Sequence, residues 1–283
     1  MKYGIVMFPT EYSIDPVSLG KAVEERGFDS IFLPDHTHIP ASRRTPWPGG
    51  AELPKEYYHC YDVFLALTAI AATSPKLLVG TGVCLIMERD PIQTANEIAS
   101  LDLLSNGRFI FGVGGGWNEE EMENHGTDPK RRFKVMRERI EAMKEIWTKD
   151  EAEYHGEFVN FDPIWSWPKP VQKPHPPVYV GGDGENTLKR VISYGDAWMP
   201  IPGRGAPLSE KVTQLQDMAT QVGRGPIPVS AYGVLPRPEV INHYAEIGIE
   251  RCIFWLPAST PDEAASHLDR YAALMKEVAT AGA

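Results

Sequence analysis

The sequence has few cysteines and no long apolar run, and both shortages limit what the protein can be. Its three cysteines are widely spaced, at Cys60, Cys84 and Cys252, so we predict neither a disulfide framework nor a paired-cysteine metal site. The longest nearly apolar run, residues 77–87, is well short of the roughly 20 residues that a membrane-spanning helix requires. We therefore predict no membrane segment and, because no secretory signal follows Met1, a cytoplasmic protein.

Positive charge is scarce as well. The chain has 28 lysines and arginines against 38 aspartates and glutamates, which gives a formal net charge of −10. Such a chain is poorly suited to bind the phosphate backbone of a nucleic acid or an anionic membrane surface. We therefore predict a small organic substrate rather than a nucleic acid or a membrane as the partner, and we expect local groups to bind any anionic ligand.

Short apolar runs alternate with segments of helical periodicity along the chain, which is typical of repeated βα units around a parallel sheet. Eight runs are predicted strands: residues 3–8, 30–33, 77–83, 109–113, 178–180, 197–199, 229–232 and 252–256. The predicted helices are residues 15–26, 61–72, 92–104, 118–124, 132–147, 184–194, 208–222, 238–247 and 262–278. Because a helix follows each strand, we predict an α/β fold of the (β/α)8 TIM-barrel type, formed as a single domain by residues 1–283.

Two stretches interrupt this alternation. Residues 37–58 are rich in Pro, Gly, Arg and Tyr, and residues 152–177 combine a hairpin-like segment with many prolines. Long irregular segments in a compact barrel are typically lids or binding loops. Their aromatic side chains are candidates for lining a pocket, although packing within the loops explains each one equally well; they are Trp47, Tyr57, Tyr58, Trp165 and Trp167, with Tyr61 just beyond the first loop.

Two glycine-rich turns stand at the carboxyl ends of predicted strands, where the active site of a barrel lies. Each precedes a predicted helix, so its backbone N–H groups can bind a phosphate or let a planar ring approach the chain. Tight turns that serve packing alone are the alternative. The first turn contains Gly114, Gly115, Gly116 and Trp117, and the second contains Gly181, Gly182 and Asp183, after a strand that ends at Val180.

The first turn does not form a dinucleotide-binding fingerprint. The pattern GxGxxG would require glycine at Trp117, and Arg131 and Arg132 stand where that motif expects an acid about 20 residues later. The acidic run at Glu119, Glu120, Glu121 and Glu123 follows it. We predict this run to be a solvated face, because carboxylates are favoured at a helix start; a metal cluster with His125 is the alternative.

Asp35 and His36 follow the second strand at the same edge of the barrel. Histidine is the side chain best suited to transfer a proton near neutral pH, although an Asp-His pair is also a common way to begin a loop. The His36-x-His38 spacing is similar to the metal-binding start of barrel amidohydrolases, so a metal-dependent hydrolase is an alternative. Later strand ends lack the further ligands that such a site needs, and we predict no metal.

The strand-end motifs, taken in order, resemble the luciferase-like monooxygenase superfamily, and within it the class that uses the deazaflavin coenzyme F420. The resemblance extends from Tyr3 to about Pro200 and is strongest over residues 90–126. The motifs that carry it are LDLLSNGR at 101–108, GVGGGWNEEE at 112–121, PVYVGG at 177–182 and GDAW at 195–198.

This resemblance implies where the cofactor binds. Its ring is expected in the barrel mouth, against a bulge after the third strand formed by a non-proline cis peptide between Gly82 and Val83. Its phosphate contacts map onto the two glycine turns described above. The resemblance also implies that His36 takes up or gives a proton beside the reacting ring, with Asp35 orienting it. The remaining cofactor-binding candidates are Gly114, Gly115, Gly116, Trp117, Val180, Gly181, Gly182 and Asp183.

The same resemblance implies an oxidoreductase that transfers hydride to or from an organic substrate. Reduced FMN in this site would instead insert an oxygen atom, so an FMN-dependent monooxygenase is the main alternative, and a non-catalytic flavin-binding protein is another. Similar sugar-phosphate dehydrogenases carry a catalytic Glu in the turn after the fourth strand, where this chain has Trp117. A larger or more apolar substrate than glucose 6-phosphate is therefore expected. A homodimer is a family expectation.

Overall fold

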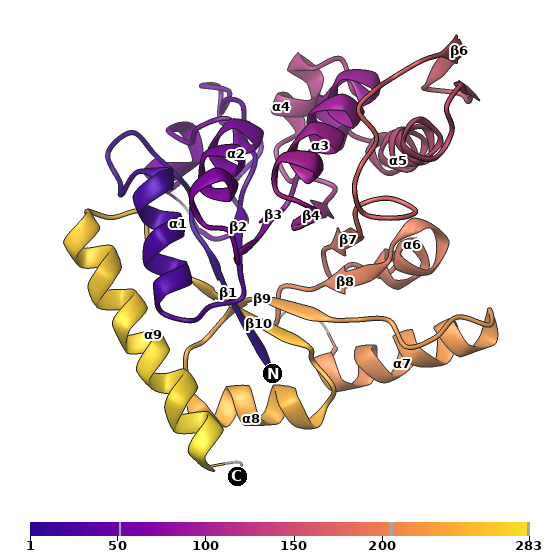
Figure 1. Ribbon diagram of the computed structural model, residues 1–283. Coiled ribbons are helices and arrows are strands. Elements are labelled where there is room, and N and C mark those ends of the chain that lie inside the picture. Colours follow the sequence, from indigo (N-terminus) through magenta and orange to yellow (C-terminus); the bar gives the residue numbers. More distant parts are fainter. Residues whose placement is uncertain (51, 204–205, 282–283) are drawn as a thin grey trace.

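Ten strands and nine α-helices make up the part of the chain that the computed structural model describes, residues 1–50, 52–203 and 206–281 (Figure 1). The strands are β1 (Lys2–Val6), β2 (Ser30–Leu33), β3 (Leu78–Thr81), β4 (Phe109–Val113), β5 (Ala152–His155), β6 (Asn160–Ile164), β7 (Val178–Gly181), β8 (Ala197–Met199), β9 (Ser230–Val234) and β10 (Arg251–Trp255). The helices are α1 (Pro16–Glu25), α2 (Val63–Thr73), α3 (Pro91–Leu104), α4 (Glu119–Asn124), α5 (Arg132–Thr148), α6 (Thr187–Tyr194), α7 (Leu208–Gln221), α8 (Pro238–Glu246) and α9 (Pro261–Ala281). Two 3-10 turns, η1 (Lys55–Tyr58) and η2 (Ile86–Glu88), lie in the connections.

Eight of these strands form one parallel sheet, which is nearly closed into a barrel. Their order is β8-β7-β4-β3-β2-β1-β10-β9. A bridge between Trp198 and Val229 joins the two ends of the sheet, and the Trp198 amide donates to the Pro228 carbonyl at 3.0 Å. The helices surround the strands (Figure 1). The predicted (β/α)8 barrel and its eight strands are confirmed.

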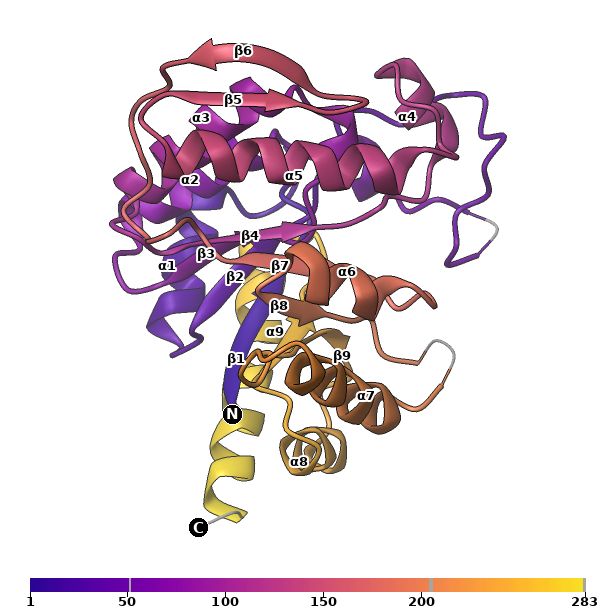
Figure 2. The same cartoon turned by 90° about the vertical axis from the view of Figure 1, so that its right-hand side faces the viewer.

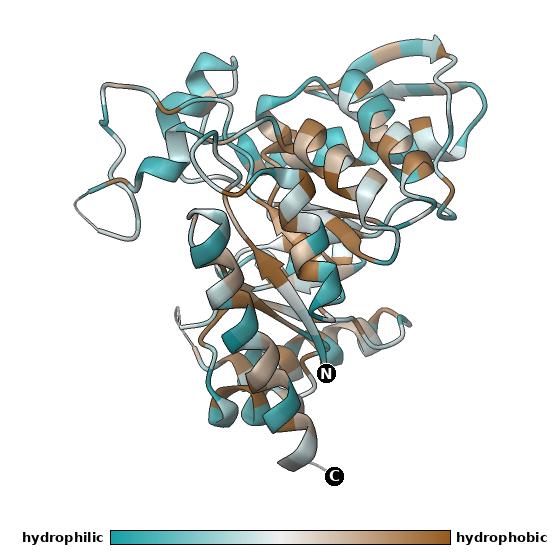
Figure 3. Cartoon of the chain, turned by 60° about the vertical axis from the view of Figure 1, so that its left-hand side comes forward, coloured by the Kyte–Doolittle hydropathy of each residue, from teal (hydrophilic) through white to brown (hydrophobic). Residues whose placement is uncertain are grey.

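Burial on both faces explains why the strands are short apolar runs. Every residue of β2, β4 and β8 is buried. Inside the barrel, side chains from different strands fill the space, among them Val6, Phe32, Tyr179 and Ile253, so the interior is a packed core rather than a channel. Figure 3 shows the strands largely in brown and the surrounding helices banded in teal and brown. No helix in the described ranges is long and apolar enough to cross a membrane.

Polar caps fix where several helices begin, and so which segments remain at the barrel mouth. The carboxylates of Asp15, Asp62 and Asp90 accept hydrogen bonds from backbone amides in the first turns of α1, α2 and α3. Asn118 caps α4 in the same way. A cap of this kind satisfies one of the free N–H groups at a helix start. The glycine turn before Asn118 is therefore left outside α4, at the end of β4.

The two irregular stretches occupy different places. Residues 37–50 and 52–58 lie with α4 beyond the carboxyl ends of the strands, whereas β5 and β6 lie on the far side of α5 from β4 (Figure 2). The buried Glu138 carboxylate on α5 accepts from the amides of Phe158 and Val159 at 2.6 and 3.2 Å. The prediction that residues 152–177 form a lid or binding loop is therefore wrong. Its apolar residues cover α5, and Trp165 and Trp167 remain exposed.

Candidate active site

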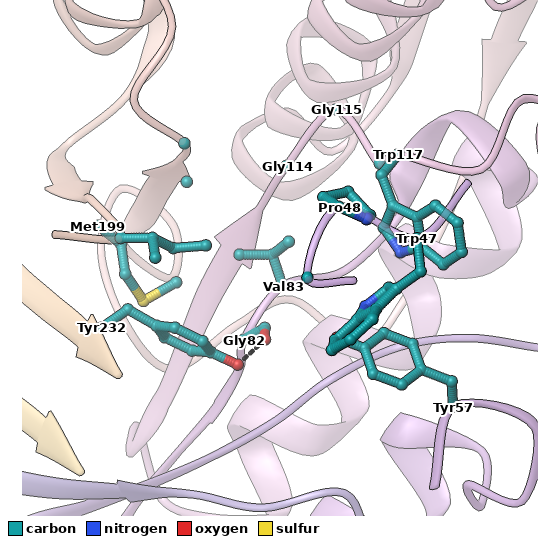
Figure 4. A pocket seen from close by; sticks show the side chains of 15 residues that line it. Trp47, Pro48, Tyr57, Gly82, Val83, Gly114, Gly115, Trp117, Met199 and Tyr232 are labelled. Atoms are coloured by element: carbon teal, nitrogen blue, oxygen red, sulfur yellow. Dashed lines mark hydrogen bonds between the residues drawn. The ribbon is translucent and has the colours of Figure 1, made fainter. Parts of the chain in front are cut away.

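A cavity in two adjoining parts opens at the carboxyl ends of the barrel strands. The inner part has a volume of about 280 Å³ and is lined by both glycine turns (Figure 4). The outer part has a volume of about 500 Å³ and reaches His36 and Trp255. Gly82, Val83 and Trp117 line both parts. The cavity is therefore continuous from the glycine turns to the histidine predicted to be catalytic.

The glycine turns have the shape of a cradle that any side chain would fill. A Cβ atom at Gly114 would lie 2.5 Å from Cγ2 of Val83, and one at Gly181 would lie 2.9 Å from its Cγ1. Gly116 and Gly182 have φ angles of +63° and +105°, which side-chain-bearing residues rarely adopt. The backbone itself therefore faces the cavity at both turns. This arrangement fits a phosphate or a flat ring.

The bulge after β3 lies against both turns, because the Val83 side chain is close to Gly114 and to Gly181. The Gly82–Val83 peptide bond is cis, as the resemblance implied, and the Val83 side chain lies between the turns (Figure 4). The Tyr232 hydroxyl, from the middle of β9, donates a hydrogen bond to the Gly82 carbonyl oxygen. Burial raises the pKa of Tyr232 well above its usual value, so the hydroxyl keeps the proton that it donates.

His36 is held by a carboxylate from another element. Its Nδ1 donates to Glu121 on α4, at 2.8 Å from Oε2 and 3.0 Å from Oε1. The side chains of both residues are more than nine-tenths buried. Because the carboxylate can only accept, Nδ1 carries a proton, and in the neutral ring Nε2 is the nitrogen with the lone pair. The ring is packed among Phe8, Tyr57 and Trp117, with centroid distances of 5.3 to 6.3 Å.

Asp35 does not orient His36 as the resemblance implied, because its carboxylate has other partners. Arg89 donates to both of its oxygens, at 2.7 and 2.9 Å, and the Leu85 amide donates at 3.1 Å. Burial alone would raise the pKa of Asp35, but the Arg89 guanidinium outweighs burial and lowers it. Asp35 therefore remains a carboxylate that fixes the segment after β3, while Glu121 is the positioning residue for His36.

The acidic run is not a solvated face throughout. Glu120 and Glu121 are buried, with exposed fractions of 4% and 1%; only Glu119 and Glu123 are exposed, as predicted for all four. Glu88 of η2 is also buried, and its Oε1 has no hydrogen-bond partner. Burial, followed by the charges of Glu121 and Asp35, raises the pKa of Glu88 to about 9. The region behind His36 is thus rich in buried carboxyl groups.

Glu120 attaches the loop at residues 37–58 to α4. Its carboxylate accepts from the Thr45 amide at 2.9 Å and from the Thr45 hydroxyl, and Arg44 donates to Glu123 at 2.6 Å. Desolvation would raise the pKa of Glu120, but the hydrogen bonds from Thr45 lower it to about 2. This attachment holds Trp47, which lines both parts of the cavity.

Most of the predicted site residues line the cavity, and a few do not. Val180 is fully buried behind it, and the Asp183 carboxylate pairs with Lys211 at 2.5 Å. Tyr58 and Tyr61 are exposed. Lining residues that sequence reasoning missed come mainly from the ends of the later strands, a position that itself marks them as candidates: Met199, Ile201, Tyr232 and Trp255. Glu121 was also missed, because a carboxylate at a helix start is expected on a solvated face and no feature of the local sequence indicates its burial.

His38, the second histidine of the His-x-His pair, has other hydrogen-bond partners than Glu121, the partner of His36. The Asn124 amide and His38 Nε2 are 2.9 Å apart, and the Thr37 hydroxyl lies 2.9 Å from Nδ1 of His38 and from Nε2 of His125. Across the described ranges, no group of three or more His, Cys, Asp or Glu side chains could hold a metal ion.

Comparison with known proteins points to one family. Residues 14–236 match the luciferase-like monooxygenase family. An uncharacterized protein of Mycobacterium tuberculosis is 41% identical over 278 residues, which cover 96% of this chain and 98% of that protein. The F420-dependent glucose-6-phosphate dehydrogenase of Amycolatopsis mediterranei is 26% identical, with 91% of this chain and 84% of that protein covered. The oxygenase component of the flavin-dependent trigonelline monooxygenase of Acinetobacter baylyi is 33% identical over 134 residues, 47% of this chain and 37% of that protein.

Solved structures share the fold over nearly the whole chain. The monooxygenase RslO1 from Streptomyces bottropensis superimposes with a TM-score of 0.81 at 19% identity, covering 98% of this chain and 99% of that one. An F420-dependent secondary alcohol dehydrogenase gives a TM-score of 0.78 at 17% identity, with 98% of both chains covered. At these identities, the similarity shows the fold alone.

Proposed function

The chain belongs to the luciferase-like monooxygenase family, and from this premise we propose that it is an oxidoreductase that binds the deazaflavin coenzyme F420 and transfers hydride to or from an organic substrate. The observation that carries this proposal is the cavity that joins two open glycine turns to a buried histidine. The F420-dependent relative from Amycolatopsis supports the choice of cofactor.

The first turn would hold the cofactor's phosphate through backbone N–H groups at Gly115 and Gly116, and Gly181 and Gly182 would border the same space without a side chain. Val83, which lies between the turns, would support the ring (Figure 4). When bound, the deazaflavin supplies the hydride donor or acceptor; the protein supplies orientation, a proton and exclusion of water.

His36 moves the proton in this proposal. Its Nδ1–H is committed to Glu121, so Nε2 is the nitrogen that accepts a proton from a substrate hydroxyl or, once protonated, gives one to a developing alkoxide. The Glu121 carboxylate stabilises the imidazolium that forms in between. A base such as His36, placed at the carboxyl ends of the barrel strands, is suited to oxidation of an alcohol or reduction of a carbonyl.

The lining of the outer cavity suits a neutral, largely apolar substrate. Its side chains include Phe8, Trp47, Tyr57, Trp117 and Trp255. Among the lining residues that the structure describes there is no lysine or arginine, and the acids are Asp35 and Glu56. A phosphorylated sugar would find no cation here to replace its hydration, so the proposed substrate is an uncharged alcohol, ketone or enone with a ring or chain that packs on aromatic faces.

Turnover under anaerobic conditions tests this proposal. The purified protein is mixed with reduced F420 and a panel of neutral ketones and enones, and with oxidised F420 and the matching alcohols, while cofactor absorbance is followed. We expect substrate-dependent oxidation or reduction of F420 without oxygen. A panel that leaves F420 unchanged, while reduced FMN supports substrate-dependent oxygen uptake in a parallel aerobic assay, would contradict the proposal.

A reduced-FMN monooxygenase is the second candidate, favoured by the 33% identical segment of the trigonelline monooxygenase component. The same glycine turns would accept the phosphate of FMN. In that reaction, the protein must also shield the cofactor from water, and the aromatic lining of the cavity would serve this purpose. Oxygen uptake in the experiment above separates the two candidates.

A further inference from the structure

A basic groove lies on the outside of the barrel between α5 and α6. It has a volume of about 240 Å³, and its side chains come from the start of α5 and from one face of α6. Four of its eight lining residues are cations, and none of those that the structure describes is acidic. The cations are Lys134, Arg137, Lys189 and Arg190. For a chain with a net charge of −10, this is a local concentration of positive charge.

The groove adjoins the first glycine turn through the ring of Phe133. A Cβ atom at Gly115 would lie 2.4 Å from the Phe133 ring, so the first glycine turn rests on that ring. On the groove side, the Arg190 guanidinium carbon lies 3.5 Å from the centroid of the same ring. Helix α6 follows directly after the second glycine turn, at Thr187. The Phe133 ring therefore lies between the first glycine turn and the groove, and a ligand anchored at the turns would pass this ring to enter the groove.

The cations of the groove are only weakly neutralised by the protein. Lys134 is 3.9 Å from Glu157, and Arg137 Nε is 3.7 Å from Glu141, both as exposed pairs. Lys189 donates to the Asn186 side-chain oxygen at 3.2 Å. Exposed ion pairs at such distances contribute little to stability, so these side chains are free to exchange their partners for the anionic groups of a ligand.

Resting on the proposed function, we propose that this groove binds the anionic tail of the cofactor beyond its phosphate. FMN ends at the phosphate, whereas F420 continues from it into a chain of glutamate units that carry carboxylates. Carboxylates spaced along a flexible chain match lysines and arginines spaced along two helices. The groove would therefore favour F420 over FMN, and longer tails over shorter ones.

Binding, rather than activity, tests this proposal. Dissociation constants are measured by fluorescence for oxidised F420 with several glutamates and for the same deazaflavin without glutamates, at low and at high salt. The variant carries Lys134→Glu and Lys189→Glu, both at exposed positions of the groove. The matched control carries Lys276→Glu at an exposed position on α9, outside the groove residues.

The wild-type protein should bind the long-tailed form roughly tenfold more tightly at low salt, and high salt should remove most of that advantage. The double variant should lose the advantage, and the Lys276→Glu control should keep it. Equal affinity for both forms in the wild-type protein, or an advantage that survives in the double variant, would overturn the groove assignment while leaving the proposed function intact. Binding of neither form would overturn the proposed function itself.

Discussion

His36 owes its orientation to Glu121, a residue 85 positions later in the chain. The family resemblance implied that Asp35, directly before His36, orients the imidazole ring. In the structure, Arg89 and the Leu85 amide take both oxygens of Asp35. A buried carboxylate is bound by the strongest donor within reach, and which donor that is depends on how β3 and α4 pack, not on sequence distance.

Replacing His36 should separate binding from catalysis. The variant His36→Asn keeps an N–H donor for Glu121 but removes Nε2, so we expect cofactor affinity to change by less than about threefold and turnover to fall by about 100-fold or more. The control His38→Asn should retain turnover, because His38 contacts Thr37 and Asn124 rather than the cavity. Cofactor titration and steady-state rates check both; unchanged turnover in His36→Asn would remove His36 from the reaction.

Glu88 should make the folded protein less stable as the pH rises. In the unfolded chain this carboxyl group loses its proton near pH 4.5, whereas in the folded protein its pKa is raised to about 9. Between these values the folded state binds the extra proton, so the free energy of unfolding falls with increasing pH. The variant Glu88→Gln removes this dependence.

Urea unfolding at pH 5.5, 7.0 and 8.5 measures the effect. We expect Glu88→Gln to gain stability relative to the wild-type protein as the pH rises, by more than about 1 kcal/mol at pH 8.5. Glu25→Gln, which changes an exposed carboxylate on α1, serves as the control and should follow the wild-type curve. Parallel curves for Glu88→Gln and the wild-type protein would contradict the assignment.

At the scale of the elements, the glycine turn after β4 is the part of the cradle most sensitive to substitution. Gly116 has a φ of +63° and lines the cavity, so Gly116→Val combines backbone strain with a side chain next to the ligand. Gly126 has a φ of +78°, and nothing lies within 4 Å of a Cβ placed there. Gly126→Val therefore imposes similar strain away from the cavity.

We expect Gly116→Val to weaken cofactor binding by at least about tenfold, because steric exclusion adds to the strain. Gly126→Val should destabilise the protein to a similar extent and leave affinity unchanged. Thermal melting and fluorescence titration of the two variants separate the effects. Equal cofactor affinity in both folded variants would mean that the turn does not hold the phosphate.

The loop at residues 37–58 depends on Glu120 for its attachment to α4. Removing the carboxylate in Glu120→Ala takes away the acceptor for the Thr45 amide and hydroxyl. A loss of about 1 kcal/mol corresponds to about a fivefold larger open population. Trypsin, which cuts after Arg43 and Arg44, should therefore nick the folded variant about fivefold faster. The neighbouring exposed Glu119→Ala should not change the rate; equal rates for both variants would show that Glu120 is not the attachment.

The elements differ in how far the sequence determines them. The eight strands are predictable because each is a short apolar run buried on both faces and bounded by turn residues. Residues 152–177 show no such pattern, and their prolines do not indicate which surface they cover; contacts with Glu138 place β5 and β6 outside α5. The glycine turns were predictable as candidate ligand sites because each stands between the end of a strand and the start of a helix.

For the whole molecule, the net charge does not reveal the local cluster of cations on which the proposed binding of the cofactor tail depends. A net charge of −10 does not predict that Lys134, Arg137, Lys189 and Arg190 gather in one groove. That gathering arises because α5 and α6, separated by the β5–β6 hairpin in sequence, are neighbours around the barrel (Figure 2). The homodimer stays a prediction.

The central claim is that the cavity at the barrel mouth is built for a deazaflavin. Parallel titrations of the purified protein with F420 and with FMN, each oxidised and reduced, test it most directly through quenching of cofactor or tryptophan emission. We expect F420 to bind at least about tenfold more tightly than FMN, since both would share the phosphate turns but, in this proposal, only F420 reaches the basic groove. Tighter binding of reduced FMN, or binding of neither cofactor, would contradict it.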